Sequence, residues 1–164
     1  MELIKMEKKQ RNKLTALVQR IRAARNDPSK LNELIEKYVS EYGRDADQIV
    51  LDIIAEETRH AWSELAKERG SNSIDDLLDT LWKSFGTVGG EYTVRRVGGK
   101  VQIYATKCPM ADTYRKLGKE EFGLMFHCST DPHIVAGFNE NMNFEISRTL
   151  MAGDEHCNHC YSLK

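Results

Sequence analysis

Apolar residues recur every three or four positions through the first half of the chain, the spacing that gathers them on one face of a helix. Asp27-Pro28 and Ser73-Ile74-Asp75-Asp76 are typical helix starts. We therefore predict four helices, one within residues 1–25 and the others over 28–42, 45–69 and 74–85. Their predicted buried positions are Leu14, Leu17, Val18 and Ile21, then Leu31, Leu34, Ile35 and Tyr38, then Ile49, Val50, Ile53, Ile54, Ala61, Trp62 and Leu65, then Leu77, Leu78, Leu81, Trp82 and Phe85.

After Gly86 the pattern changes to alternation, which is typical of strands. Residues 91–97 and 100–106 are rich in β-branched and aromatic side chains, and Gly98-Gly99 separates them, so we predict a hairpin with a two-residue turn. Residues 143–151 and 157–163 alternate in the same way and predict a second hairpin. Short helices are predicted between the hairpins, over residues 109–117, 119–127 and 131–137.

These elements predict an α+β fold. N-terminal helices would pack on a small antiparallel sheet of about four strands, formed by the two hairpins, with short helices inserted between them. A chain of 164 residues is long enough to bury one core. We therefore expect one domain over 1–164, with a helical half (1–86) and a cysteine-rich half (87–164).

Charge and composition narrow the range of partners. The formal net charge is -1, and the basic residues near the N-terminus are interleaved with apolar positions but with no aromatic side chains for base stacking. We expect no nucleic-acid partner. No stretch approaches the roughly 20 apolar residues of a membrane span, so we expect no membrane partner and a cytoplasmic location. The amphipathic first helix, with Leu14, Val18 and Ile21, could serve a homodimer.

All four cysteines and four of the five histidines fall between Cys108 and Tyr161. In a reducing cytosol such cysteines are more often free thiols or metal ligands than disulfides. Cys108 precedes Pro109 at a predicted helix start, where unpaired N–H groups favour a thiolate and would lower the thiol pKa from about 8.5. We predict Cys108 as a nucleophile. The alternative is a small buried residue at the boundary of an element.

A metal site is a second interpretation of the same region. Cys157-Asn158-His159-Cys160 is a C-x-x-C pattern, and zinc or an iron–sulfur cluster takes four thiolate or mixed ligands. The alternative ligands are Cys108, Cys128, His156, Cys157 and Cys160. On a strand, however, residues three apart point to opposite faces, so Cys157 and Cys160 could share a metal only if the backbone turned.

Several short motifs follow one another in a specific order and spacing. They are Lys107-Cys108-Pro109, Tyr114-Arg115-Lys116-Leu117-Gly118, Cys128-Ser129-Thr130-Asp131, Gly137-Phe138-Asn139, and Arg148-Thr149-Leu150-Met151-Ala152-Gly153-Asp154 with Cys157. Together they resemble the L-2-amino-thiazoline-4-carboxylic acid hydrolase family over roughly residues 86–161. The chain departs from the family pattern at His159, where an aromatic residue is expected, and Cys160 is additional.

The resemblance implies a hydrolase that opens a carbon–nitrogen bond in a cyclic amidine, turning a thiazoline ring into a carbamoyl-cysteine. It places Cys128 and Cys157 with the nucleophile Cys108 around one pocket, without a cofactor and with a small-molecule substrate. The candidates for proton transfer are Asp131, Asp154, His127 and His156. The candidates for substrate binding are Arg115 or Arg148 for a carboxylate, and Asn139 for the amidine or a carbonyl oxygen.

Simpler roles exist for these residues, and other functions exist for the pocket. Asp131 could cap a helix, Asp154 could belong to a turn, and the arginines could be surface charges. If the thiols bound zinc, the metal would activate water and no thiol would attack. A third class is a ligand- or redox-sensing module built on a cysteine pocket.

Overall fold

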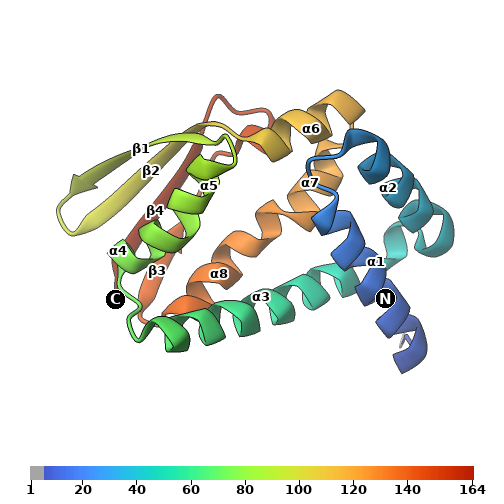
Figure 1. The fold of residues 1–164 in the computed structure, drawn as a ribbon, viewed down its shortest axis with the longest axis horizontal. Helices are drawn as coiled ribbons and strands as arrows, with labels where there is room; N and C mark the ends of the chain where they lie inside the picture. Colours follow the sequence, from blue (N-terminus) through green and yellow to red (C-terminus); the bar gives the residue numbers. More distant parts are fainter. Residues whose placement is uncertain (1–5) are drawn as a thin grey trace.

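The computed structural model describes residues 6–164 (Figure 1). Lys5, the first basic residue of the N-terminal stretch, lies outside this range. In chain order the elements are α1 (Lys8–Ala23), α2 (Pro28–Tyr42), η1 (Arg44–Ala46), α3 (Asp47–Arg69), α4 (Ile74–Leu77), η2 (Leu78–Trp82), α5 (Lys83–Thr87), β1 (Glu91–Val97), β2 (Lys100–Lys107), α6 (Pro109–Leu117), α7 (Glu120–Phe126), η3 (Cys128–Thr130), α8 (Asp131–Phe138), β3 (Met142–Glu145), η4 (Leu150–Ala152) and β4 (Cys157–Leu163).

Helix boundaries follow the local signals. The Asp27 side chain accepts the Lys30 N–H at 3.1 Å and starts α2. Ser73 and Asp76 form a complete capping box at the start of α4, which confirms that prediction. Gly118, with a φ of 64°, ends α6. The fourth predicted helix continues from α4 to α5, but its middle part, η2, is a π-helical turn.

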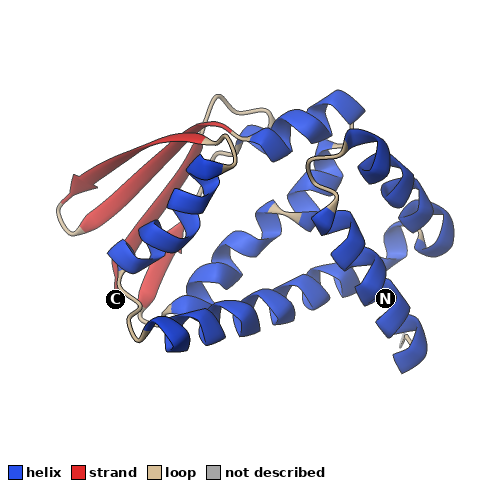
Figure 2. Ribbon diagram, in the orientation of Figure 1, coloured by secondary structure: helices blue, strands red, loops and turns tan. Residues whose placement is uncertain are grey.

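The four strands form one antiparallel sheet in the order β1-β2-β4-β3 (Figure 2). Each predicted hairpin is present, as β1–β2 and β3–β4, and the pairing of β2 with β4 joins them. Gly98 and Gly99 have φ values of 55° and 77°, as a two-residue turn of this kind requires. The predicted α+β fold class is therefore confirmed.

The third strand is shorter than its alternating sequence suggested. Its pairing with β4 ends at Glu145, opposite Cys160. Further on, the backbone N–H groups of Ser147 and Arg148 donate to the side-chain oxygen of Asn158 in β4, at 2.9 and 2.8 Å, instead of to a backbone carbonyl of that strand. The predicted strand over 143–151 was therefore wrong beyond Glu145, because a side chain replaces the ladder there.

One face of the sheet is buried against helices. Alternate residues of β2 point to this face, and the register places Ala105 opposite Cys157 and Ile103 opposite His159. Helices α4, α5 and α8 cover this face (Figure 1). Because side chains alternate along a strand, Cys157 and His159 face these helices, whereas Cys160 points to the other face.

The buried side chains form two clusters. The first joins α1, α2 and α3 to α6 and α7. The second joins the sheet to α4, η2 and α8. Leu14, Val18 and Ile21 are fully buried in the first cluster, so this stripe packs inside the chain. A homodimer stays a prediction, and it would need a different surface.

The two clusters meet at Cys157, which packs against both. Helix α3 runs from the first cluster to the second and lies along α8 (Figure 1). Among residues 6–164, no helix combines the length and the apolar character needed to cross a membrane.

Candidate active site

A cavity of about 150 Å³ lies where the two clusters meet. Three of the four thiols line it, together with one carboxyl group and two imidazoles, and aromatic and aliphatic side chains form the rest of its wall. The polar members are Cys108, His127, Cys128, Thr130, Asp131, Cys157 and His159. The cavity thus gathers residues from α6, η3, α8 and β4, which are far apart in the sequence.

The groups that carry the chemistry stand where elements begin. Cys108 is the residue that precedes α6, Cys128 begins η3, Asp131 begins α8, and Cys157 begins β4. The Cys157 Sγ accepts the backbone N–H of Leu150 at 3.2 Å. The starts of these elements therefore converge on one small volume, which brings Cys108, Cys128, Asp131 and Cys157 together.

Burial raises the pKa values of the three thiols that line the cavity. It raises the pKa of Cys108, although the backbone N–H groups of Ala111 and Met110 at the start of α6 act in the opposite direction. It also raises the pKa of Cys128, and that of Cys157 to about 11. The expected lowering of the Cys108 pKa was therefore wrong, because loss of water around the thiol outweighs the effect of the helix start.

Asp131 is the carboxyl group of the cavity. Its side chain retains 21% of its accessible surface, and since Asp131 lines the cavity, we take this surface to open there. Burial raises the pKa of Asp131 to about 7. No side chain caps α8, so Asp131 does not act as the helix cap that its position before Pro132 suggested. A carboxyl group in this state exchanges its proton near neutral pH.

His159 is the functional candidate that the sequence analysis missed. Its Nε2 lies 3.8 Å from Asp131 Oδ2, and its Nδ1 is buried with no hydrogen-bond partner among the described residues. Burial lowers the pKa of His159 to about 4, so the ring is neutral at pH 7. The available signal was its position two residues after Cys157 on a strand, which places both side chains on one face.

His127 lines the cavity, and a buried tyrosine positions its ring. Its Nε2 lies 2.9 Å from the Tyr114 hydroxyl. Burial, together with the nearby Arg22 and Arg25 charges, lowers the pKa of His127 to about 3. Arg22 donates to the Phe126 carbonyl at 2.6 Å, which fixes this charge close to the ring. His127 is therefore also neutral at pH 7.

The other predicted site residues lie outside the cavity lining. Asp154 accepts the Thr149 N–H at 2.9 Å and shapes the loop before β4. Arg115 donates to the Leu150 carbonyl at 2.9 Å, and Arg148 is exposed. His156 packs against Tyr104, with ring centroids 5.4 Å apart. Their roles in the site stay predictions, and any role in substrate binding would have to be played from outside this cavity.

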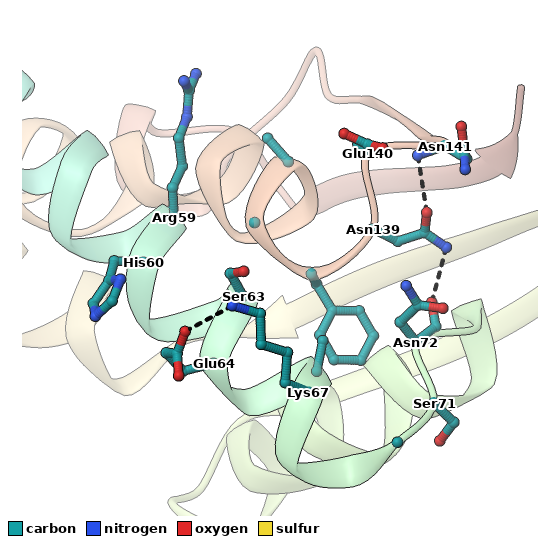
Figure 3. A pocket seen from close by; sticks show the side chains of 15 residues that line it. Arg59, His60, Ser63, Glu64, Lys67, Ser71, Asn72, Asn139, Glu140 and Asn141 are labelled. Atoms are coloured by element: carbon teal, nitrogen blue, oxygen red, sulfur yellow. Dashed lines mark hydrogen bonds and ion pairs between the residues drawn. The ribbon is translucent and has the colours of Figure 1, made fainter.

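Asn139 lies in a different and larger hollow, an open groove of about 820 Å³ between the end of α3 and the end of α8 (Figure 3). Its side chain donates to the Asn72 carbonyl at 3.0 Å and accepts the Asn141 N–H at 2.8 Å. The groove contains no cysteine. The thiol cavity, although smaller, is therefore the better candidate active site.

The alternative metal-ligand set is not assembled. Cys160 points away from the face that carries Cys157, and His156 packs against Tyr104. Within residues 6–164, no three His, Cys, Asp or Glu side chains are grouped so that they could hold a metal ion.

The fold and the cavity together define an α+β protein in which three thiols line one cavity with a carboxyl group whose pKa is raised by burial to about 7. The family model described as L-2-amino-thiazoline-4-carboxylic acid hydrolase matches residues 8–161. The chain therefore belongs to this family, and the match extends the resemblance from the cysteine-rich half to nearly the whole chain. No curated protein and no solved structure matches it. Family membership supports a hydrolase.

Proposed function

We propose that this protein opens the ring of a small cyclic amidine of the thiazoline type by breaking a carbon–nitrogen bond, with Cys108 as nucleophile and Asp131 as proton carrier. The observation that carries the proposal is the cavity in which three thiols meet a carboxyl group with a pKa of about 7. A cavity of roughly 150 Å³ accepts a molecule the size of benzene. The substrate is therefore a single ring.

The first half of the proposed reaction forms a covalent intermediate. The Cys108 sulfur adds to the ring carbon of a protonated amidine, the carbon bonded to sulfur and two nitrogens, as Asp131 takes the thiol proton. The bond from this carbon to the ring nitrogen then breaks. Asp131 returns the proton to the departing nitrogen, which becomes a free amine. The carbon remains bonded to Cys108, to the substrate sulfur and to the exocyclic nitrogen.

The second half consumes water. Asp131 takes a proton from a water molecule as its oxygen adds to the same carbon. The bond to Cys108 then breaks, and the departing sulfur regains its proton from Asp131. The hydroxyl proton on the carbon passes to the released amine, so the product is an open-chain thiocarbamate with an ammonium group. One carboxyl group with a pKa near the working pH can serve each of these transfers.

Cys108 is favoured as nucleophile over the other two thiols by its place at a helix start. The N–H groups of Met110 and Ala111 stabilise negative charge on its sulfur. Cys128 stands at a short 3-10 turn, and the pKa of Cys157 lies at about 11. In this proposal, Cys128 and Cys157 shape the cavity around the reacting carbon.

The direct test compares Cys108→Ser with Cys160→Ser. Cys160 lies on the same strand as Cys157 but on the opposite face, so Cys160→Ser is a matched control. We expect Cys108→Ser to lose at least about 10³-fold in kcat/KM for ring opening, measured by chromatography of the thiocarbamate product. Cys160→Ser should stay within about twofold, and unfolding curves establish that both variants are folded. Full activity of Cys108→Ser would refute the nucleophile assignment.

A thiol-based sensor is the second candidate, because the three thiols share one cavity. It predicts reversible disulfide formation with a peroxide and no ring opening of any cyclic amidine. Burial raises the pKa of all three thiols and so disfavours the thiolates that peroxides oxidise. The hydrolase meets the same penalty at Cys108, but there Asp131 takes the thiol proton during the attack, and the family match supports a hydrolase.

A further inference from the structure

The lining of the cavity contains no positive side chain. Neither Lys nor Arg occurs among the described residues that form its wall. Arg115, a predicted partner for a substrate carboxylate, is instead bonded to the Leu150 carbonyl and lies 3.5 Å from Asp112. Arg148, the other predicted partner, is exposed and is not part of the wall.

A carboxylate inside this cavity would be poorly compensated. Trp82, Phe85 and Ile134 form part of the wall and offer an anion little in place of water. The ionised Asp131 would add repulsion between like charges. The substrate that gives the family its name carries a carboxylate on the ring, so this cavity is ill suited to enclose that molecule as a whole.

A cation without a carboxylate is stabilised by the same wall. Among the described residues, Asp131 accepts no hydrogen bond, so both of its oxygens are available to the N–H groups of a protonated amidine. The indole of Trp82 and the ring of Phe85 favour a flat cation beside them. His127 and His159 are neutral and add no competing positive charge.

We propose that the substrate of this protein is a single-ring amidinium or isothiouronium cation that lacks a carboxylate, and that Asp131 selects it by charge. This inference rests on the proposed function, since it names the substrate class of the same site. It separates this chain from the substrate that the family description names, while keeping the same bond-breaking chemistry.

Binding tests the inference independently of turnover. Two ligands, 2-amino-thiazoline and its 4-carboxylate, are titrated calorimetrically at pH 8 into Cys108→Ser protein. We expect the ring without the carboxylate to bind at least about tenfold more tightly. Adding Asp131→Asn should remove most of this preference. Tighter binding of the carboxylate would overturn the inference. Thermal shifts of the unmodified protein with each ligand repeat the comparison if the variant is poorly folded.

Arginine variants provide a control for the carboxylate. If Arg115 or Arg148 held that group, Arg115→Ala or Arg148→Ala would weaken binding of the 4-carboxylate selectively. We expect both variants to bind the two rings as the parent protein does. Selective loss in either variant would contradict the inference.

Turnover by the unmodified protein separates the two proposals. If neither ring is hydrolysed but the ring without the carboxylate binds preferentially, the proposed hydrolysis fails and the substrate class stands. If both rings are hydrolysed and the carboxylate is preferred in binding and in kcat/KM, the inference fails and the hydrolase stands.

Discussion

At the scale of single residues, two adjacent groups set the charge inside the cavity. Asp131 and His159 lie 3.8 Å apart, yet burial shifts their pKa values in opposite senses, to about 7 and about 4. Each shift disfavours the charged form of its group. The carboxyl group thus changes its charge near neutral pH while the imidazole stays neutral, so between these two groups Asp131 decides the charge of the cavity.

The wall behind this pair depends on one buried hydrogen bond. Trp82 Nε1 donates to the Tyr161 hydroxyl at 3.0 Å. We expect Tyr161→Phe to lower the free energy of unfolding by about 1–3 kcal/mol, because the indole N–H would stay buried without a partner. Denaturant unfolding measures the change.

Tyr104→Phe is the matched control for this prediction. Tyr104 belongs to the neighbouring strand β2 but points to the outer face of the sheet, where it is only partly buried. The control should stay within about 0.5 kcal/mol of the parent protein. Equal effects of the two variants would show that the Trp82 bond contributes nothing specific.

At the scale of elements, the sequence predicts best where the signal is local. Asp27, Ser73 and Gly118 mark helix ends through bonds or backbone angles within a few residues of themselves, so their predictions hold. The end of β3 depends instead on the Asn158 side chain, eleven positions away from Ser147. Alternation alone cannot reveal this contact, and the predicted strand therefore ran too far.

The contact between α3 and α8 positions Asp131 and requires a glycine. A Cβ atom at Gly137 would lie 2.4 Å from the Arg59 carbonyl oxygen, which belongs to the backbone of α3. Gly137→Ala must push the helices apart, and we expect a loss of about 1–3 kcal/mol in stability. Ring-opening activity should fall too, because Asp131 begins the helix that moves.

Gly86→Ala is the control for this contact. Gly86 also lies in a helix, α5, but its added Cβ would meet only the Tyr92 ring, at an ordinary 3.5 Å. The change should be neutral, or stabilising by up to about 1 kcal/mol, because alanine favours a helix over glycine. Thermal unfolding and kcat/KM of both variants test the pair, and a Gly137→Ala protein as stable and active as the parent would contradict the close contact.

At the scale of the whole molecule, the site is a product of the fold more than of any motif. The motifs identify Cys108, Cys128, Asp131 and Cys157, and the fold brings these four together. It also adds Trp82 from the helical half, and His159 through the register of β4. Trp82 depends on contacts between distant segments, which spacing along the chain does not encode. His159 follows from its spacing of two residues from Cys157, once β4 is known to be a strand. Asn139 shows the converse, since it belongs to one of the motifs but lines another groove.

Buried titratable groups also make the stability of the whole molecule depend on pH. The pKa of Asp131 is raised from 3.8 to about 7 on folding, so between these values the unfolded chain releases a proton that the folded chain keeps. Stability therefore falls as pH rises from about 4 to about 7. His127 and His159 act in the opposite sense, because their pKa values are lowered from 6.5 to about 3 and about 4. The two effects partly cancel in the parent protein.

Asp131→Asn removes the contribution of Asp131 to this pH dependence and leaves those of the two histidines. The variant has no carboxyl group at this position, so its stability does not fall for this reason as the pH rises. Its free energy of unfolding relative to the parent should therefore increase between pH 5 and pH 7, by at most about 1.4 kcal/mol per pH unit. Above pH 7 the difference should level off, because Asp131 is then ionised in both the folded and the unfolded chain. Urea unfolding of both proteins at pH 5, 6, 7 and 8 measures the difference. A difference that stays constant over this range would mean that Asp131 titrates like an exposed carboxyl group, and it could then not carry protons at neutral pH in the proposed reaction.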